Sequence, residues 1–232
     1  MDKKLDVVYI LRNASTRWRN QEIKYSLRSI SKNLLFNKVW IVTGELPRFI
    51  DGDRVGLIKA NDPYANKLRN AIHKISLACK DDRVTDDFIL MNDDFYFLKP
   101  SNEVEYFNKG RLESAVKYHA TKGGYYYRAI RDTVQILRDM GIAHPIDFEV
   151  HYPIIFNKKK FIETIDKVSD HEAFLFRSIY GNINNIKSKY RKDIKVFNQR
   201  QFERTKILDF MSTDEKMATT KLFKNGLKEN SR

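Results

Sequence analysis

Short apolar runs alternate with longer segments of helical periodicity along the first half of the chain. The runs are apolar almost throughout, which is typical of strands buried on both faces. We predict strands over Leu5–Leu11, Lys38–Thr43, Val55–Ile58 and Asp87–Met91. Apolar residues spaced three or four apart predict one helix between Trp18 and Leu34 and another over Ala65–Cys79. This alternation predicts an α/β fold of Rossmann type, a mostly parallel sheet flanked by helices whose strand carboxyl ends share one ligand-binding edge.

The second half of the chain is less regular. Its periodicity predicts helices near Arg111–His119, Tyr126–Met140, Lys159–Val168 and His171–Tyr180, and a short strand around Tyr152–Phe156. A capping box over Ser212–Glu215 predicts a last helix from about Thr213 to Lys224. We therefore expect a domain over residues 1–185 and a helical, basic C-terminal extension over residues 186–232 that packs on it.

Composition limits the class of protein. Hydrophobic residues make up 42% of the 232 residues, which is enough for a folded core. The single cysteine, Cys79, excludes a disulfide framework and a cysteine-rich zinc site. No apolar run reaches the roughly 20 residues of a membrane helix, and the N-terminus has no signal-peptide core. These features predict a soluble cytoplasmic protein.

The net charge of +13 favours partners that carry phosphate, such as nucleotides, nucleic acid or teichoic-type polymers, or an anionic membrane surface. The segment from Ile186 to Arg232 holds thirteen Lys and Arg against six Asp and Glu, so over half of the excess lies there. A basic solvated tail without a specific partner is the alternative interpretation.

Adjacent carboxylates at Asp93 and Asp94 follow the strand predicted over Asp87–Met91 and precede a second apolar run. Like charges in such an environment are costly unless a cation neutralises them. Oxygen ligands suit Mg²⁺ or Mn²⁺, which commonly bind one or two carboxylates together with substrate phosphates. The pair therefore predicts a metal site, and the alternative is a turn whose aspartates cap backbone amides.

Three titratable residues alternate at Asp147, Glu149 and His151. On an extended segment they would share one face and could supply a general base, a third metal ligand, or both. An edge strand with its polar face in water is the alternative. A smaller candidate is Ala65–Asn70, where Lys67 and Asn70 at a helix start are suited to a phosphate or ribose.

Aromatic and basic residues interleave over Lys122–Arg128 and again from Lys187 to Arg204. Such side chains can stack on bases while neutralising phosphates. They also stack on sugars, and they occur as core residues between solvated charges.

Several stretches resemble the Stealth family of sugar-phosphate transferases, which make capsular polysaccharides and include the lysosomal-enzyme N-acetylglucosamine-1-phosphotransferase. The matching stretches are Asp6–Tyr9, Asn20–Ile30, Val39–Thr43 with Leu46-Pro47, Asn70–Ile75, Phe88–Phe95 with its Asn-Asp-Asp motif, His151–Pro153 and Phe176–Ser178. The chain departs from the family after the first strand, where Leu11-Arg12-Asn13-Ala14 replaces a Trp-Val-Asp/Asn-Gly turn. More broadly, a Rossmann-like sheet with an acidic motif after a central strand is similar to GT-A glycosyltransferases.

The resemblance implies a UDP-sugar site near Tyr9, Arg12, Lys67 and Asn70. It also implies that Asp93 and Asp94 bind the metal, with His151 as a third ligand or a base. Asp94, Asp147, Glu149 and His151 are the candidate catalytic residues, and Glu149 or Asp147 could deprotonate the acceptor hydroxyl.

The leading hypothesis is a metal-dependent glycosyltransferase that uses a UDP-sugar and Mn²⁺ or Mg²⁺. Its acceptor is expected to be an anionic polymer, and hydroxymethylated DNA bases flipped out of the duplex fit the basic charge. One alternative is a Stealth-like sugar-1-phosphate transferase acting on a polysaccharide. Another is a nucleic-acid-binding module without activity on a transferase fold.

Overall fold

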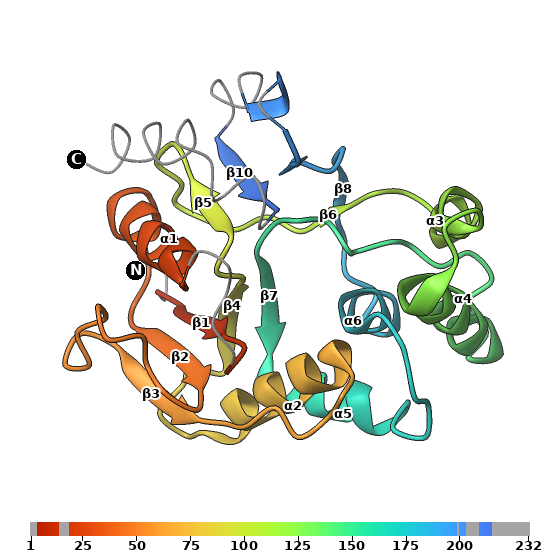
Figure 1. Cartoon of the computed structure of the whole chain (residues 1–232). Helices are drawn as coiled ribbons and strands as arrows, with labels where there is room; N and C mark the ends of the chain where they lie inside the picture. Colours follow the sequence, from red (N-terminus) through yellow and green to blue (C-terminus); the bar gives the residue numbers. More distant parts are fainter. Residues whose placement is uncertain (1–3, 14–18, 199, 203–208, 215–232) are drawn as a thin grey trace.

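Five strands form the central sheet, in the order β3-β2-β1-β4-β7 (Figure 1). The computed structural model describes residues 4–13, 19–198, 200–202 and 209–214. The strands are β1 (Asp6–Ile10), β2 (Val39–Thr43), β3 (Gly56–Lys59), β4 (Asp87–Met91) and β7 (Ile154–Asn157). The first four run parallel, and β7 pairs antiparallel with β4 at the edge. The predicted α/β class with a mostly parallel sheet is confirmed.

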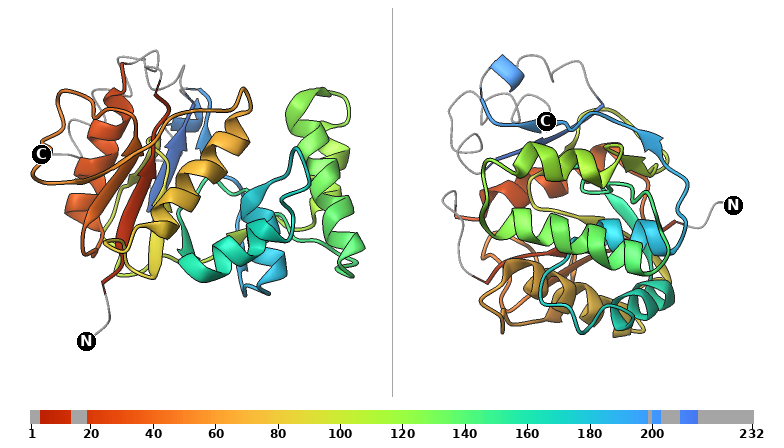
Figure 2. Two further views of the ribbon diagram at one scale, coloured as in Figure 1. Left: turned by 90° about the horizontal axis from the view of Figure 1, so that it is seen from below. Right: turned by 90° about the vertical axis from the view of Figure 1, so that its right-hand side faces the viewer.

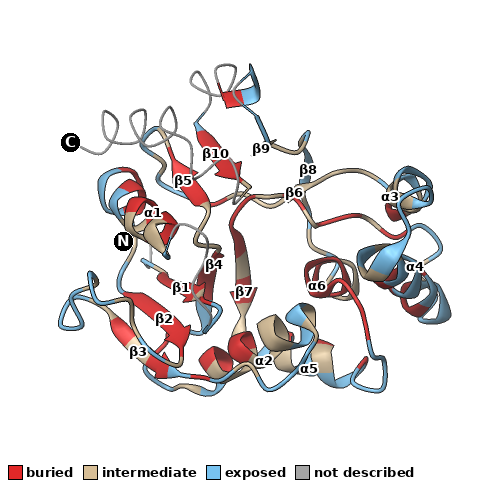
Figure 3. Cartoon of the chain, in the orientation of Figure 1, coloured by how far each residue is buried: buried red, intermediate tan, exposed pale blue. Residues whose placement is uncertain are grey.

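The central strands are largely buried (Figure 3). Their residues alternate between two hydrophobic cores, one on each face of the sheet. In β1, Val8 packs into one core while Val7 and Tyr9 pack into the other. This period of two is a property of extended backbone, and burial of both faces explains why each strand reads as a continuous apolar run. The sequence pattern therefore located these strands to within a residue or two.

Helices cover both faces of the sheet (Figures 1 and 2). Their bounds are α1 (Gln21–Asn33), α2 (Lys67–Lys80), α3 (Leu112–His119), α4 (Gly124–Asp139), α5 (Lys158–Asp166) and α6 (Phe176–Ile183). On one face, Ile23 and Ile30 of α1 join the core that contains Val7 and Tyr9. Helices α2, α4, α5 and α6 contribute to the other core. The paired helices α3 and α4 stand to one side of the sheet, beyond β7 (Figure 2).

A buried aspartate joins the start of β1 to its neighbours. Asp6 is 1% exposed. Its carboxylate accepts hydrogen bonds from Asn37 Nδ2 (2.7 Å), Lys38 N (3.1 Å), Trp40 Nε1 (2.9 Å) and Thr85 N (3.0 Å). These bonds satisfy a charge that would otherwise be costly to bury, and they fix the ends of three adjacent strands.

The C-terminal segment returns to the body of the protein as strands. Strand β10 (Phe210–Thr213) pairs with β5 (Phe95–Phe97) and β9 (Lys195–Val196), and β8 (Lys189–Tyr190) pairs with β6 (Phe107–Asn108). The expected helical extension is thus not confirmed where the segment is described, apart from a short helical stretch at 200–202. Thr213, predicted to begin the last helix, ends β10, and Asp214 after it is not helical. Residues 215–224 of the predicted helix lie outside the described residues.

Two other sequence expectations need correction. The helix predicted from His171 begins at Phe176. Residues 173–175 before it are buried, and Leu175 has an extended backbone whose N–H donates to Thr133 Oγ1 at 2.8 Å. The strand predicted around Tyr152 begins at Ile154, after an irregular segment. Within the part of the chain that the structure describes, no helix is long and apolar enough to cross a membrane.

Candidate active site

The carboxyl ends of β1 and β4 meet where the strand order reverses. The chain leaves β1 for β2 on one side and returns as β4 on the other, which makes this boundary the switch point of the sheet. In open α/β sheets, ligands bind outside the strand ends at such a point. Arg12 and Asn13 follow β1, and Asn92, Asp93 and Asp94 follow β4. Two of the sequence-predicted groups are therefore brought to one edge.

The two carboxylates after β4 have different surroundings. Asp94 Oδ2 accepts a hydrogen bond from Ser212 Oγ (3.0 Å) and lies 3.4 Å from Lys195 Nζ. Burial, together with the negative charges of Asp94 and Glu22, raises the pKa of Asp93 to about 7. The C-terminal segment thus neutralises Asp94, while Asp93 remains in an environment that favours either a proton or a cation.

A polar network that the sequence did not reveal closes the edge between β1 and β3. Asn13 N donates to Asp62 Oδ2 (2.8 Å), and Gly44 N donates to Asn13 Oδ1 (2.8 Å). The Nζ of buried Lys74 lies 2.6 Å from Asp62 Oδ1 and also donates to Leu11 O. Burial opposes ionisation of Asp62, but the bond from Asn13 and the contact with Lys74 outweigh it and lower the pKa of Asp62. These contacts hold Leu11 and Asn13, directly after β1, in place.

The four residues expected to bind the nucleotide have different environments. Tyr9 is 0% exposed and its hydroxyl lies 2.8 Å from Ser26 Oγ, so it packs β1 against α1 and offers no surface to a ligand. Asn70 is also engaged, because it accepts from Tyr64 N (2.9 Å) and donates to Tyr64 O (2.6 Å). Arg12 and Lys67 are exposed, and their expected contact with a diphosphate stays a prediction.

The N-terminus of α2, considered as a phosphate or ribose site, is capped by the chain itself. Asn66 Oδ1 accepts from the backbone N–H groups of Leu68 (2.8 Å) and Arg69 (3.3 Å). Asn66 Nδ2 donates to Tyr125 OH of α4. The cap therefore also ties the sheet side of the molecule to the α3–α4 pair.

The segment from Asp147 to His151 is irregular, which corrects the expectation that its titratable side chains alternate along a strand. Asp147 Oδ1 accepts from Glu149 N at 2.8 Å, a local bond that an extended strand would not make. Phe148 is buried against Gly181 of α6, so closely that a Cβ at residue 181 would lie 2.5 Å from the Phe148 ring. Close packing against α6 thus fixes the conformation of this loop.

Each titratable residue of this loop has its own partner. His151 Nδ1 lies 2.8 Å from Asp193 Oδ2, and Lys109 Nζ lies 3.7 Å from Asp147 and 3.8 Å from Asp193. Burial raises the pKa of Asp193, but the hydrogen bonds and charge of His151, with Lys109, outweigh it and bring the value to about 2. Asp193 is therefore ionised, and it holds the His151 ring so that Nε2 is the nitrogen left to exchange a proton.

Glu149 turns toward α6. Its Oε1 accepts from Ser178 N (3.1 Å) and Ser178 Oγ (3.2 Å), and burial raises the pKa of the Glu149 carboxyl although Arg177 opposes this. We name the group formed by Lys109, Asp147, Glu149, His151 and Asp193 the acidic cluster.

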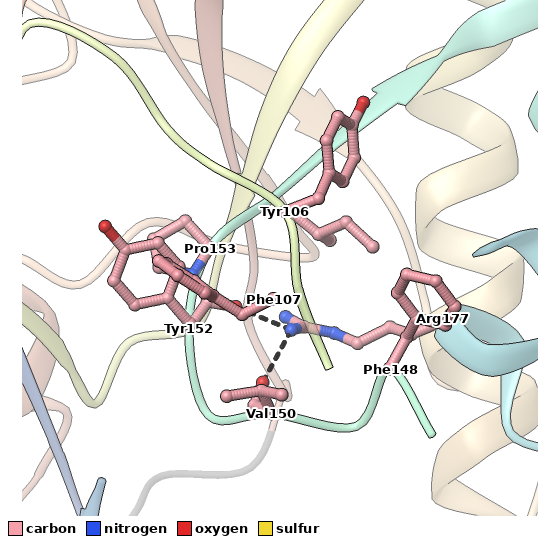
Figure 4. A pocket seen from close by; sticks show the side chains of 8 residues that line it. Tyr106, Phe107, Phe148, Val150, Tyr152, Pro153 and Arg177 are labelled. Atoms are coloured by element: carbon pink, nitrogen blue, oxygen red, sulfur yellow. Dashed lines mark hydrogen bonds between the residues drawn. The ribbon is translucent and has the colours of Figure 1, made fainter. Parts of the chain in front are cut away.

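Arg177 is 5% exposed, and its guanidinium points to the loop that carries Val150 and Tyr152 (Figure 4). Its Nη1 donates to Val150 O (3.0 Å) and Tyr152 O (2.6 Å), the carbonyls on either side of His151. Its Nη2 has no hydrogen-bond partner among the described residues, and its guanidinium lies 5.7 Å from the Phe95 ring, next to Asp94 in sequence. Burial lowers the pKa of Arg177, whereas Glu149, Asp94 and Asp193 raise it. Sequence reasoning noticed Arg177 only through a family resemblance.

The expected set of three metal ligands is not assembled. Among the residues that the structure describes, no group of three or more His, Cys, Asp or Glu side chains is arranged to hold a metal ion. His151 is held by Asp193 and does not join Asp93 and Asp94 in such a group. A divalent ion here would therefore need ligands from its substrate as well as from the aspartate pair.

Comparisons with known proteins decide the fold family. No protein-family model and no curated protein matches the chain. Among solved structures, the galactosyltransferase LgtC in complex with donor and acceptor sugar analogues aligns with a TM-score of 0.53 and 9% identity over 97% of this chain and 96% of LgtC. An active-site variant of LgtC gives 0.51 and 9% over 98% and 95%. The glycosyltransferase GlyE of Streptococcus pneumoniae TIGR4, without ligand, gives 0.46 and 12% over 99% of this chain and 60% of GlyE.

The chain has a GT-A glycosyltransferase fold. At 9% identity the likeness to LgtC shows the GT-A fold alone, so roles for individual residues must come from the geometry above. Within this GT-A fold, Asp93 and Asp94 follow β4 at the switch point. The acidic cluster comes from three other segments, the one after β6, the one before β7 and the one after β8.

Proposed function

We propose that this protein is a metal-dependent glycosyltransferase that transfers a sugar from a UDP-sugar. The observation that carries the proposal is the position of Asp93 and Asp94 at the switch point of a GT-A fold. Adjacent carboxylates at a strand end beside Glu22 create negative charge in a largely buried place, and a ligand that brings a cation relieves it.

The residues present fit Mg²⁺ or Mn²⁺. Such ions accept one or two carboxylates and take their remaining ligands from phosphates and water, so a complete protein cage is not needed. Asp93 and Asp94 would hold the ion, which when bound would neutralise the diphosphate as it leaves. Arg12 and Lys67, both exposed at the same edge, would add positive charge for the diphosphate.

His151 is the base that the geometry favours for the acceptor hydroxyl. Its Nδ1 is bound to the ionised Asp193, and Nε2 can therefore take the proton. Asp147 is bound to Glu149 N and Lys109, and Glu149 is bound to Ser178, so both carboxylates are less available for this role. Arg177 would hold the loop that carries His151 in position by donating hydrogen bonds to Val150 O and Tyr152 O.

The acceptor we propose is an anionic polymer, with hydroxymethylated DNA bases as the nucleophile. The net charge of +13 supports a phosphate-bearing acceptor. A base would have to leave the duplex to bring its hydroxyl to the acidic cluster, as in other enzymes that modify bases.

The test is to incubate the protein with UDP-glucose or UDP-N-acetylglucosamine, with Mn²⁺ or with EDTA, and to measure nucleotide release. We expect metal-dependent release of UDP that is lost in Asp94→Asn and increased by hydroxymethylated DNA. Release of UMP in place of UDP would identify a sugar-phosphate transferase, the activity that the Stealth resemblance suggests. Release of neither nucleotide, with DNA binding intact, would identify a binding module without activity.

A further inference from the structure

The α3–α4 pair has a row of aromatic rings on its outer surface. The ring centroids of Tyr118 and His119 are 4.9 Å apart, and those of His119 and Tyr126 are 5.3 Å apart. Tyr118 is 67% exposed and Tyr126 is 36% exposed. We name these three residues the aromatic row.

The aromatic row is not needed for the hydrophobic core. Helix α4 buries its other side, including Ala129, Ile130 and Leu137, against the rest of the protein. A tyrosine ring left two-thirds exposed has a large apolar surface in contact with water, and removing that surface from water would favour binding of a flat partner.

Positive charge accompanies the rings. Lys122 Nζ lies 4.4 Å from the centroid of the Tyr118 ring. Residues 111–131 contain five Lys and Arg against one Glu. The turn between the helices is open, since a Cβ on Gly123 or Gly124 would meet nothing within 4 Å, and α4 begins without a side-chain cap. A phosphate could therefore approach Lys122 and the first N–H groups of α4.

The inner end of the aromatic row borders the acidic cluster. Partial burial raises the pKa of Tyr126, and so do the charges of Glu149, Asp147 and Asp193. Burial lowers the pKa of His119, together with Lys122 and Lys109, while Asp147 opposes this. A chain lying along the aromatic row would consequently reach the residues proposed to receive the acceptor hydroxyl.

We propose that the α3–α4 pair binds a single-stranded stretch of DNA, stacking bases on Tyr118 and Tyr126 and pairing phosphates with Lys122. Interleaved rings and cations match a polymer in which flat bases and phosphates alternate. A neutral glycan would use the rings but would leave the excess of positive charge without a role. The inference rests on the proposed function, because it assigns a place to the acceptor of that reaction.

The experiment measures the anisotropy of a fluorescein-labelled oligothymidine with the full chain at 50 and 200 mM NaCl. We expect Tyr118→Ala to weaken binding about 5- to 150-fold, the range for one stacked base. Lys122→Ala should make the slope of log affinity against log salt shallower by about 0.7, the value for one phosphate contact on a single strand. Lys80→Ala, an exposed lysine at the far end of α2, should change neither quantity.

Tyr190→Ala is the matched aromatic control, because Tyr190 is 72% exposed but belongs to β8. Loss of binding in Tyr190→Ala without loss in Tyr118→Ala would place the DNA on the C-terminal segment and overturn the proposal. Absence of oligonucleotide binding, or binding of an acidic polysaccharide that Tyr118→Ala abolishes, would overturn it as well. Release of UDP by the wild-type protein is measured separately and without DNA. A protein that releases no UDP is therefore distinguishable from one that does not bind DNA on the α3–α4 pair.

Discussion

Asp93→Asn should make the metal-free protein more stable at neutral and basic pH. The pKa of Asp93 rises from an ordinary 3.8 to about 7, first because of burial and then because of Asp94 and Glu22. Between these two values the folded protein holds a proton that the unfolded chain has lost. The stability of the wild-type protein therefore falls as the pH rises through this window, and an amide at residue 93 removes the effect.

The size of the gain follows from the two pKa values. Each pKa unit corresponds to about 1.4 kcal/mol, which gives a ceiling of about 4 kcal/mol at pH 8 and about 1.7 kcal/mol at pH 5. Solvent and counter-ions near the partly exposed pair will reduce both values, and about half of each ceiling is a reasonable expectation. The gain at pH 8 should still be roughly 2.5 times the gain at pH 5, because the same screening affects both.

Chemical denaturation in EDTA at the two pH values measures these gains. Asp94→Asn is the control, since it relieves Asp93 of one negative charge but loses the pairing of Asp94 with Ser212 and Lys195, so it should stabilise the protein less than Asp93→Asn. Adding Mn²⁺ at 100 times its dissociation constant should stabilise the wild-type protein by about 2.7 kcal/mol and Asp93→Asn far less. A variant that is less stable than the wild type at pH 8, or a gain that does not change with pH, would refute the reasoning.

Three further changes test other parts of the structure. Lys74→Met should cost about 1.5–3 kcal/mol in urea denaturation, because Asp62 loses a charged hydrogen-bond partner; a loss below about 0.5 kcal/mol would contradict the pairing. Asp6→Ala should cost at least about 3 kcal/mol by the same measurement, since four donors lose their acceptor. Asp193→Asn should lower kcat of UDP release about 10- to 100-fold with little change in KM and alter its pH profile, because His151 loses its orienting carboxylate; an unchanged profile would argue against His151 as the base.

Local patterns in the sequence located most of the central sheet and the main helices. Buried strands such as Val39–Thr43 are identifiable because burial on both faces leaves no room for polar residues. Asp93 and Asp94 were found for the complementary reason, since carboxylates next to such a strand are conspicuous. Both signals are contained within about ten consecutive residues.

The remaining site residues depend on contacts between distant parts of the chain. Asp94 meets Ser212 across 118 positions, through the pairing of β5 with β10. Strands β5 and β10 are short, and nothing in their local sequence indicates which strand each will pair with. The capping-box pattern over Ser212–Glu215 even favoured a helix where Phe210–Thr213 forms a strand, because tertiary pairing overrides a local preference.

Arg177 shows why the two halves of the site have to be considered together. It reaches the loop around His151 through Val150 O and Tyr152 O, and it lies near the ring of Phe95, which follows the aspartate pair in sequence. A buried guanidinium is stable only where carboxylates compensate it, and here Glu149, Asp94 and Asp193 come from three different segments. The positive charge of Arg177 therefore compensates carboxylates on both the proposed donor side and the proposed acceptor side. A displacement of the carboxylates on one side would change the electrostatic potential at the other.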